Sequence, residues 1–266
     1  MAQFRVTNHA ETDQGKVRSS NQDRKRIDDS LSDMVILAVA DGMGGHAGGE
    51  IASQLAINSF FKELKRSLKN KKIEPELVHK ELENAVRKSN SAVFNKSNAN
   101  SNLRGMGTTL TVAVILDGIA IFANVGDSRG YLVSNTKIQQ ITKDHSFVEE
   151  LITKGKLSKE EAQNHPNRNI ITRSIGTNAD VSVDIFRKEL NLGDIIFLCS
   201  DGLYPLVSDS EIEESLNSKE SIKKICESLI KQANTNGGPD NITVAIGKVD
   251  KLKAYNKNFI SERKYI

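Results

Sequence analysis

The sequence predicts an α+β fold in which antiparallel β-sheets pack together and pairs of helices lie outside them. Apolar segments of strand length are joined by short turns, and Asp117-Gly118 between two such segments is a strong two-residue hairpin signal. Strand and helix patterns also come in blocks, whereas they would alternate one by one around a parallel sheet. Hairpins and blocks together favour antiparallel layers.

The predicted strands are short apolar or alternating segments that end at turn residues. Met34–Ala40, with the sequence MVILAVA, is apolar throughout and predicts a buried strand. Val181–Leu190 alternates between apolar and polar residues, and the turn NLGD connects it to the next apolar segment. The remaining predicted strands are Thr108–Leu116, Ile119–Val125, Tyr131–Val133, Lys137–Ile141, Ile195–Cys199 and Asn241–Val249.

The predicted helices repeat apolar residues at intervals of three and four. In Glu50–Lys69 the apolar residues recur at positions 51, 55, 57, 60, 61, 64 and 68, so one face of this helix is expected to be buried. The basic stretch from Lys62 to Lys72 is typical of the solvated face and end of such a helix. The other predicted helices are Pro75–Asn95, Phe147–Thr153, Lys159–Ala162 and Ser221–Asn234.

The composition is that of an ordinary globular protein and argues against several other classes. The 266 residues include 37 Lys and Arg against 34 Asp and Glu, and this near balance gives no electrostatic signature of nucleic-acid binding. The first residues are polar and resemble no signal peptide, and apolar runs stay far below the ~20 residues of a membrane helix. Two cysteines cannot build a disulfide framework, so we expect a cytoplasmic protein.

Four aspartates stand at the ends of predicted apolar strands. An aspartate in this position is usually a turn or cap residue, but four of them in one chain can converge at one edge of packed sheets. Clustered carboxylates repel one another and persist with a cation between them. Only oxygen ligands are offered, which favours Mg²⁺ or Mn²⁺ over zinc. The four residues are Asp41, Asp127, Asp201 and Asp240.

Five glycines follow Asp41 within the stretch DGMGGHAGGE, which indicates that the backbone closely approaches a nucleotide, a metal ion or no ligand at all. A bare backbone here would let the carbonyl of Gly42 reach the same ion. The stretch also fits a dinucleotide-binding fingerprint through Gly42, Gly44 and Ala47, with Glu63 about twenty residues on. Asp41 would repel a pyrophosphate, however, and Glu63 lies within a predicted helix.

The sequence argues against two other phosphate chemistries and leaves a non-catalytic role open. A P-loop needs Gly-Lys-Ser/Thr, which does not follow the glycines. A cysteine phosphatase needs an arginine six residues after its nucleophile, and neither Cys199 nor Cys226 has one. A binding module that kept the fold without activity stays open, and metal-dependent turnover of a phosphopeptide would separate it from an enzyme.

The motifs, taken together, resemble those of prokaryotic metal-dependent Ser/Thr protein phosphatases of the PP2C (PPM) family. They occur in the family's order and cover roughly residues 5 to 249. The resemblance implies a four-layer αββα sandwich, with two antiparallel sheets flanked by helix pairs. The motifs are VRSSNQD (17–23), DGMGGHAGGEIAS (41–53), GMGTTLT (105–111), NVGDSRGY (124–131), DHSFVEELITKG (144–155), HPNRNIITRSIG (165–176), LCSDGLY (198–204) and GGPDNITV (237–244).

The resemblance implies a binuclear Mn²⁺ or Mg²⁺ centre that activates a water for in-line hydrolysis of phosphoserine and phosphothreonine. Asp41 would bridge the two ions, and the backbone oxygen of Gly42 would bind one of them. Asp201 and Asp240 would hold the other ion. Asp127 would form a third, weaker metal site together with Asp201.

The resemblance also assigns residues around the ions. Asp23 would hydrogen-bond to metal waters, and Arg18 would hold the substrate phosphate with its planar guanidinium. Eukaryotic members have a histidine as proposed general acid directly after the Asp-Gly pair, where this chain has Met43. His46, three residues on, either takes that role or braces the loop, and we expect bracing.

For the whole chain we expect one phosphatase domain over residues 1–250, with a flap over about 146–171 and a polar C-terminal tail over 251–266. The implied partners are phosphorylated proteins and a cognate Ser/Thr kinase. We expect a monomer that binds neither nucleic acid nor membrane.

Overall fold

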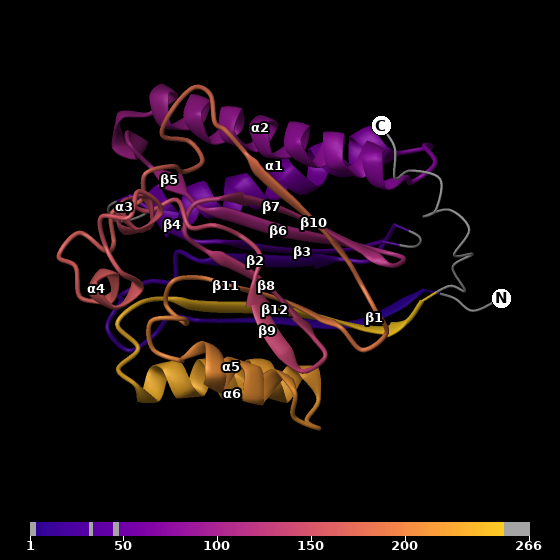
Figure 1. The fold of residues 1–266 in the computed structure, drawn as a ribbon. Coiled ribbons are helices and arrows are strands. Elements are labelled where there is room, and N and C mark those ends of the chain that lie inside the picture. The colour runs from indigo at the N-terminus through magenta and orange to yellow at the C-terminus, as the bar shows by residue number, and fades with distance from the viewer. Residues whose placement is uncertain (1–3, 32–33, 45–47, 253–266) are drawn as a thin grey trace.

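The computed structural model describes residues 4–31, 34–44 and 48–252, which form four layers of helices, sheet, sheet and helices (Figure 1). The first sheet has the strand order β10-β7-β6-β3-β2 and the second β1-β12-β11-β8-β9, with every pair antiparallel. The first sheet comprises β2 (Arg24–Asp28), β3 (Met34–Ala40), β6 (Leu110–Leu116), β7 (Ile119–Val125) and β10 (Asp184–Glu189). The second comprises β1 (Arg5–Asp13), β8 (Arg129–Ser134), β9 (Lys137–Gln140), β11 (Ile195–Cys199) and β12 (Ile242–Lys251).

Helix pairs cover the outer face of each sheet, and a third pair lies at one edge. The long helices α1 (Gly48–Leu68) and α2 (Pro75–Ala99) lie over the first sheet, while α5 (Asp209–Leu216) and α6 (Ile222–Thr235) lie over the second (Figure 1). The short helices α3 (Phe147–Thr153) and α4 (Lys159–Gln163) lie between β9 and β10 in the chain. The other elements are β4 (Gly42–Met43), β5 (Gly107–Thr108) and a 3₁₀ turn at Ser101–Leu103.

Three apolar layers hold these four layers of secondary structure together. One lies between the first sheet and its helices around Phe60 and Phe61, and another lies between the second sheet and its helices around Phe197. The third lies between the two sheets and includes Phe122 from the first sheet and Leu198 from the second. Strands β3, β6 and β7 are buried along their whole length, which explains their continuous apolar sequences.

The architecture confirms the predicted αββα sandwich, and three elements longer than three residues were not predicted from the sequence. Strands β1 and β2 lie at sheet edges, where side chains stay half exposed and the apolar signal is weak. Helix α5 has eight residues and buries only Ile212 and Leu216. Within the described ranges, every helix is too short or too polar to cross a bilayer.

Candidate metal centre

Asp41 and Asp23 come together because β3 and β2 run antiparallel. Ala40, the last residue of β3, pairs with Arg24, the first residue of β2, so the aspartates next to them share one end of the first sheet. The backbone of Asp41 is fixed by Thr109, whose hydroxyl accepts its N–H at 2.9 Å and whose N–H donates to its carbonyl at 2.8 Å. Asp23 is fully buried, and Ser200 donates its hydroxyl to Asp23 Oδ2 at 2.7 Å.

Asp201 and Asp240 meet at the corresponding end of the second sheet. Strand β11 ends two residues before Asp201, and its antiparallel neighbour β12 begins two residues after Asp240. The hydroxyl of Ser200 also accepts the N–H of Thr243 at 3.0 Å. Ser200 therefore connects the second sheet to Asp23 of the first.

Asp127 completes the set from the turn after β7. Its side chain is buried, with 4% of its surface exposed. Gly126 before it has φ +114°, and a Cβ there would lie 2.5 Å from Thr109 Cγ2, so the turn requires glycine. All four strand-end aspartates of the sequence prediction are thus placed at one edge of the sandwich, together with Asp23.

The five carboxylates influence one another electrostatically. Burial raises the pKa of Asp41, and the charges of Asp23 and Asp201 raise it further. Burial likewise raises the pKa of Asp127, with a contribution from Asp201. Burial raises the pKa of Asp23 to about 7. Such mutual repulsion at a buried site is what a cation would relieve.

The donor set fits hard divalent cations. Three buried carboxylate oxygens, Oδ1 of Asp23, Asp127 and Asp201, have no hydrogen-bond partner, although unpaired buried oxygens are costly. In the described part of the chain no three His, Cys, Asp or Glu side chains converge as a closed metal site. Carboxylate and carbonyl oxygens, together with water, are the ligands that Mg²⁺ commonly takes in proteins.

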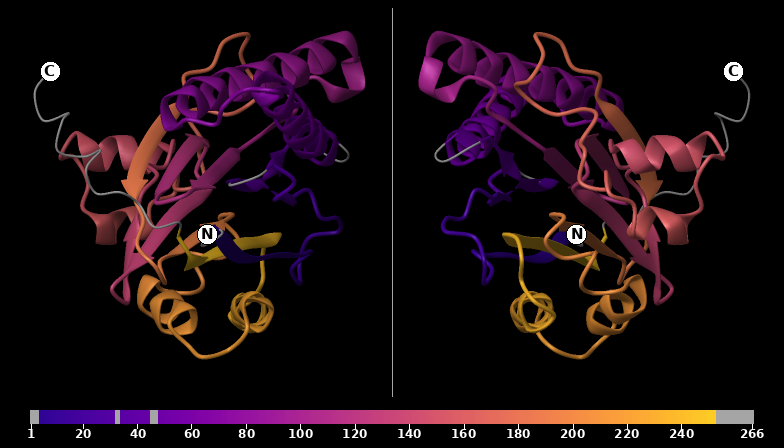
Figure 2. Two further views of the ribbon diagram at one scale, coloured as in Figure 1. Left: turned by 90° about the vertical axis from the view of Figure 1, so that its right-hand side faces the viewer. Right: turned by 90° about the vertical axis from the view of Figure 1, so that its left-hand side faces the viewer.

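Arg18 lies at the mouth of this carboxylate cluster, on the loop between β1 and β2. Its NH2 donates to Asp240 Oδ2 at 2.6 Å, while 54% of its side chain remains exposed. The hydrogen bond to Asp240 raises the pKa of Arg18, and Asp41 and Asp201 contribute to the same field. Seen from this end, the β1–β2 loop and the α3–α4 segment lie on opposite sides of the sheets (Figure 2).

The glycine-rich segment after Asp41 is only partly described. Gly42 pairs with Thr108 in the short β4–β5 ladder, and a Cβ at Gly42 would lie 2.1 Å from the carbonyl oxygen of Gly49. At Gly42 the chain is therefore tightly enclosed by its own backbone. His46 lies outside the described residues.

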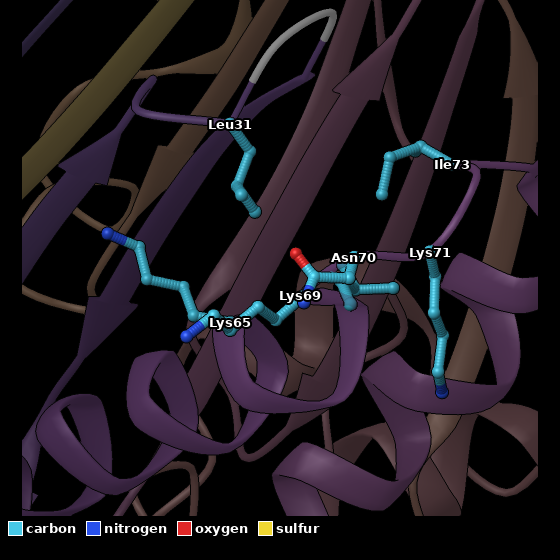
Figure 3. A pocket seen from close by; sticks show the side chains of 7 residues that line it. Leu31, Lys65, Lys69, Asn70, Lys71 and Ile73 are labelled. Atoms are coloured by element: carbon cyan, nitrogen blue, oxygen red, sulfur yellow. The ribbon is translucent and has the colours of Figure 1, made fainter.

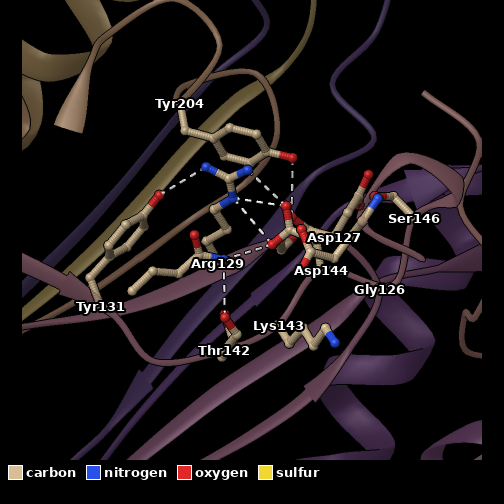
Figure 4. Close-up of polar contacts among 12 residues, drawn as sticks. Gly126, Asp127, Arg129, Tyr131, Thr142, Lys143, Asp144, Ser146 and Tyr204 are labelled. Atoms are coloured by element: carbon tan, nitrogen blue, oxygen red, sulfur yellow. Dashed lines mark hydrogen bonds and ion pairs between the residues drawn. The ribbon is translucent and has the colours of Figure 1, made fainter. Parts of the chain in front are cut away.

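Next to Asp127 lies a group of three polar side chains that was not predicted from the sequence, namely Arg129, Asp144 and Tyr204 (Figure 4). Arg129 donates through Nε and NH2 to Asp144 Oδ2, at 2.9 and 2.8 Å, and its guanidinium lies 3.5 Å from the ring centre of Tyr204. Tyr204 in turn donates its hydroxyl to the Asp127 carbonyl at 3.2 Å. The sequence signal that could have found this group is the pair of basic and acidic residues in GDSRG and DHS, read as partners.

A hollow lined by three lysines lies elsewhere and does not belong to this site. It encloses about 410 Å³ at the C-terminal end of α1, which is roughly 30 Å long and starts near the carboxylates (Figure 3). Two of its lysines are in ion pairs, Lys65 with Asp28 and Lys71 with Glu81. This supports the prediction that the basic stretch is a solvated helix end.

Comparisons with known proteins agree with this geometry. A family model described as protein phosphatase 2C matches residues 13–246. The serine/threonine phosphatase stp of Listeria monocytogenes serotype 4b (strain F2365) is 40% identical over 247 residues, which cover 91% of this chain and 96% of that protein. The crystal structure of the Mycobacterium tuberculosis phosphatase PstP/Ppp superposes with a TM-score of 0.82 at 36% identity, covering 94% of this chain and all of that one.

A further solved structure contains the catalytic domain of PstP in complex with two manganese ions. It matches with a TM-score of 0.79 and 35% identity, and covers 93% of this chain and 99% of that one.

Proposed function

Because this chain belongs to the protein phosphatase 2C family and is a metal-dependent serine/threonine phosphatase, we propose residue roles for its carboxylate cluster. The observation that supports them most strongly is the group of buried, unpaired carboxylate oxygens at the shared edge of the two sheets. The manganese in the PstP structure is consistent with this oxygen-only donor set.

Two divalent cations, Mn²⁺ or Mg²⁺, are proposed to bind between the sheets. Asp41 and the carbonyl of Gly42 would hold them from the first sheet, and Asp201 and Asp240 from the second. Asp127, with Asp201, would hold a third and weaker ion, and Asp23 would hydrogen-bond to bound water. When present, two such ions lower the pKa of a water between them, so that a nucleophile is available near neutral pH.

The chain's own residues bind and orient the phosphoryl group. Arg18 lies beside Asp240 with a partly exposed guanidinium, whose planar fork suits two phosphoryl oxygens. Holding these oxygens places phosphorus for in-line attack by water, in which the new P–O bond forms as the bond to the serine or threonine oxygen breaks. The leaving oxygen takes up a proton from water, because we expect His46 to brace the loop and not to act as the general acid.

The domain and its partners complete the proposal. One phosphatase domain would span residues 1–250, with residues 146–171 as a flap beside the cleft and 251–266 as a polar tail. Phosphorylated proteins are the substrate class implied by the family. A cognate Ser/Thr kinase and a monomeric state remain part of the proposal.

The deciding experiment measures phosphate release from a phosphothreonine peptide with Mn²⁺, and after its removal by a chelator. Activity should require the metal. Asp41→Asn and Asp240→Asn should each reduce kcat by at least about 10³-fold, because each removes negative charge that holds the two metal ions. Asp29→Asn, an exposed carboxylate change at the other end of the sheet, is the matched control. Full turnover after exhaustive chelation would refute the metal-dependent mechanism, and no turnover with or without metal would favour the binding-module alternative.

A further inference from the structure

His145 is a buried histidine that contacts the turn carrying Asp127. It lies between β9 and α3, and only 6% of its surface is exposed. Its Nδ1 accepts the backbone N–H of Gly126 at 3.0 Å, one residue before Asp127. The backbone N–H of His145 in turn donates to the Gly126 carbonyl at 3.0 Å, so the two residues form a reciprocal pair of hydrogen bonds.

The hydrogen bond from Gly126 determines which ring nitrogen of His145 carries the proton. Nδ1 can accept an N–H only when it is bare, so the neutral ring must be protonated at Nε2. Nε2 lies 3.1 Å from Asp184 Oδ2 and 3.0 Å from Arg173 NH1. The proton on Nε2 therefore goes to Asp184, and the arginine contact is not a hydrogen bond to the ring.

Arg173 holds Asp184 in place for this contact. Its NH1 donates to Asp184 Oδ1 at 2.5 Å, so the carboxylate is bound on both oxygens, by Arg173 and by His145. Burial, together with the nearby charge of Arg173, lowers the pKa of His145, which is consistent with a neutral ring. Asp184 is the first residue of β10, so the group is anchored on the edge strand of the first sheet.

Gly126 accepts a further hydrogen bond, and its backbone conformation determines the orientation of Asp127. Asn124 donates Nδ2 to the Gly126 carbonyl at 3.1 Å, and the positive φ of Gly126 fixes the direction of the next residue. The carboxylate oxygen Oδ1 of Asp127 is buried and has no partner of its own. Its position is therefore set by the backbone, which His145 holds.

The same histidine also lies where the two ends of the proposed flap meet. Thr172 donates its N–H to the His145 carbonyl at 2.8 Å, and Phe147 donates its N–H to the carbonyl of Ile170 at 2.9 Å. Ser146 and Ile171 form an isolated antiparallel bridge beside them. The base of the flap and the turn of Asp127 thus share one residue.

We propose that His145 is a positioning residue for Asp127, with Asp184 and Arg173 fixing the ring so that Nδ1 holds the Gly126 amide. The inference rests on the proposed function for the role of Asp127 as a ligand of the weaker third ion. Its specific content is that the acceptor at Nδ1, rather than the bulk of the ring, keeps this ligand in place.

Two substitutions separate the ring nitrogens. In His145→Asn the side-chain oxygen can occupy the Nδ1 position, and in His145→Gln the amide reaches the Nε2 position instead. We expect Mn²⁺ titration calorimetry to show a weakest site near wild-type affinity for His145→Asn and roughly 10- to 100-fold weaker affinity for His145→Gln. His79→Gln, at an exposed position of α2, should leave all sites unchanged.

Each outcome bears on a different part of the inference. Equal affinities in wild type and both His145 variants would overturn it, and equal losses in both would show that ring packing matters instead of the Nδ1 acceptor. If Asp127→Ala keeps every Mn²⁺ site, the third-ion assignment itself is wrong, whatever His145 does. Long-range ¹H–¹⁵N spectra of wild-type protein test the ring directly, because a proton on Nδ1 would overturn the inference even if both variants fail to fold.

Discussion

At the scale of single residues, Arg18 is both ion-paired and largely exposed. Its guanidinium is paired with Asp240, a candidate metal ligand, yet more than half of the side chain is exposed. An exposed ion pair contributes little to folding stability, so the position of Arg18 is better explained by ligand binding.

Arg18→Ala should therefore affect substrate binding more than the chemical step. Loss of a charged two-pronged contact, made in both the ground and the transition state, should raise KM roughly 10- to 100-fold and leave kcat within a few fold. Steady-state kinetics on a phosphothreonine peptide measure both constants. Arg5→Ala, which removes another exposed arginine from β1, is the control, and a kcat effect exceeding the KM effect would contradict the assignment.

Asp28 is a buried carboxylate with a purely structural role. Burial acts to raise its pKa, but hydrogen bonds from Lys65 and Ser30 outweigh burial and hold the pKa below its ordinary value. A lowered folded-state pKa stabilises the protein above the unfolded value near 4, and this stability is lost as the pH falls through the folded-state pKa.

Asp28→Asn should accordingly destabilise the protein by about 1–3 kcal/mol at pH 7. The difference from wild type should shrink as the pH falls below about 4, because the wild-type carboxyl is then protonated as well. Urea unfolding at several pH values checks this. Asp29→Asn alters the exposed neighbour and should show neither effect, whereas a difference for Asp28→Asn that does not change with pH would contradict the pKa argument.

At the scale of elements, α5 shows how a short helix is held by its first turn. The Ser208 hydroxyl accepts the N–H of Glu211, and Glu211 accepts the N–H of Ser208 at 2.8 Å, which is a capping box. A helix of eight residues is marginally stable by itself, so this cap and two buried side chains stabilise it.

Ser208→Ala should cost about 1 kcal/mol of unfolding free energy, since it leaves a helix N–H without its acceptor. Chemical denaturation measures the change, and phosphatase activity should be unaltered because α5 lies on the outer face of the second sheet (Figure 1). Ser210→Ala, at an exposed position inside the same helix, should be neutral within about 0.5 kcal/mol. Equal effects of the two substitutions would show that the cap contributes nothing.

At the scale of the whole molecule, the carboxylate cluster lies at the edge where the two sheets meet. Asp23 and Asp41 flank strands of the first sheet, Asp201 and Asp240 flank strands of the second, and Asp127 lies in the turn that connects β7 of the first sheet to β8 of the second. Cations bound between them would connect the layers, whereas carboxylates alone repel each other.

Mn²⁺ should therefore stabilise the folded protein. At a free concentration 100 times its dissociation constant, one ion adds about 2.7 kcal/mol, which for a domain of this size raises Tm by roughly 5–10 °C. Thermal unfolding with increasing Mn²⁺ tests this, and Asp41→Asn should show a much smaller rise. A rise as large for Asp41→Asn as for wild type would place the stabilising ion elsewhere.

Much of the fold was predictable because its central strands are buried on both faces and therefore apolar throughout. Ile119–Val125 and Ile195–Cys199 have the predicted bounds in the structure, and so does the helix Phe147–Thr153. Edge strand β2, with the sequence RKRID, was missed because its exposed positions carry charges that suit an edge but hide the pattern.

The sequence by itself determined the family motifs, the αββα layers and the four strand-end aspartates, because these depend on local composition and on order along the chain. Only the tertiary structure decided how His145, Asp184 and Arg173 combine behind Gly126, and how Arg129 and Tyr204 support Asp127. His145 is 19 residues from Gly126 and 39 from Asp184. Contacts at such separations follow from sheet register and burial, which no local pattern encodes.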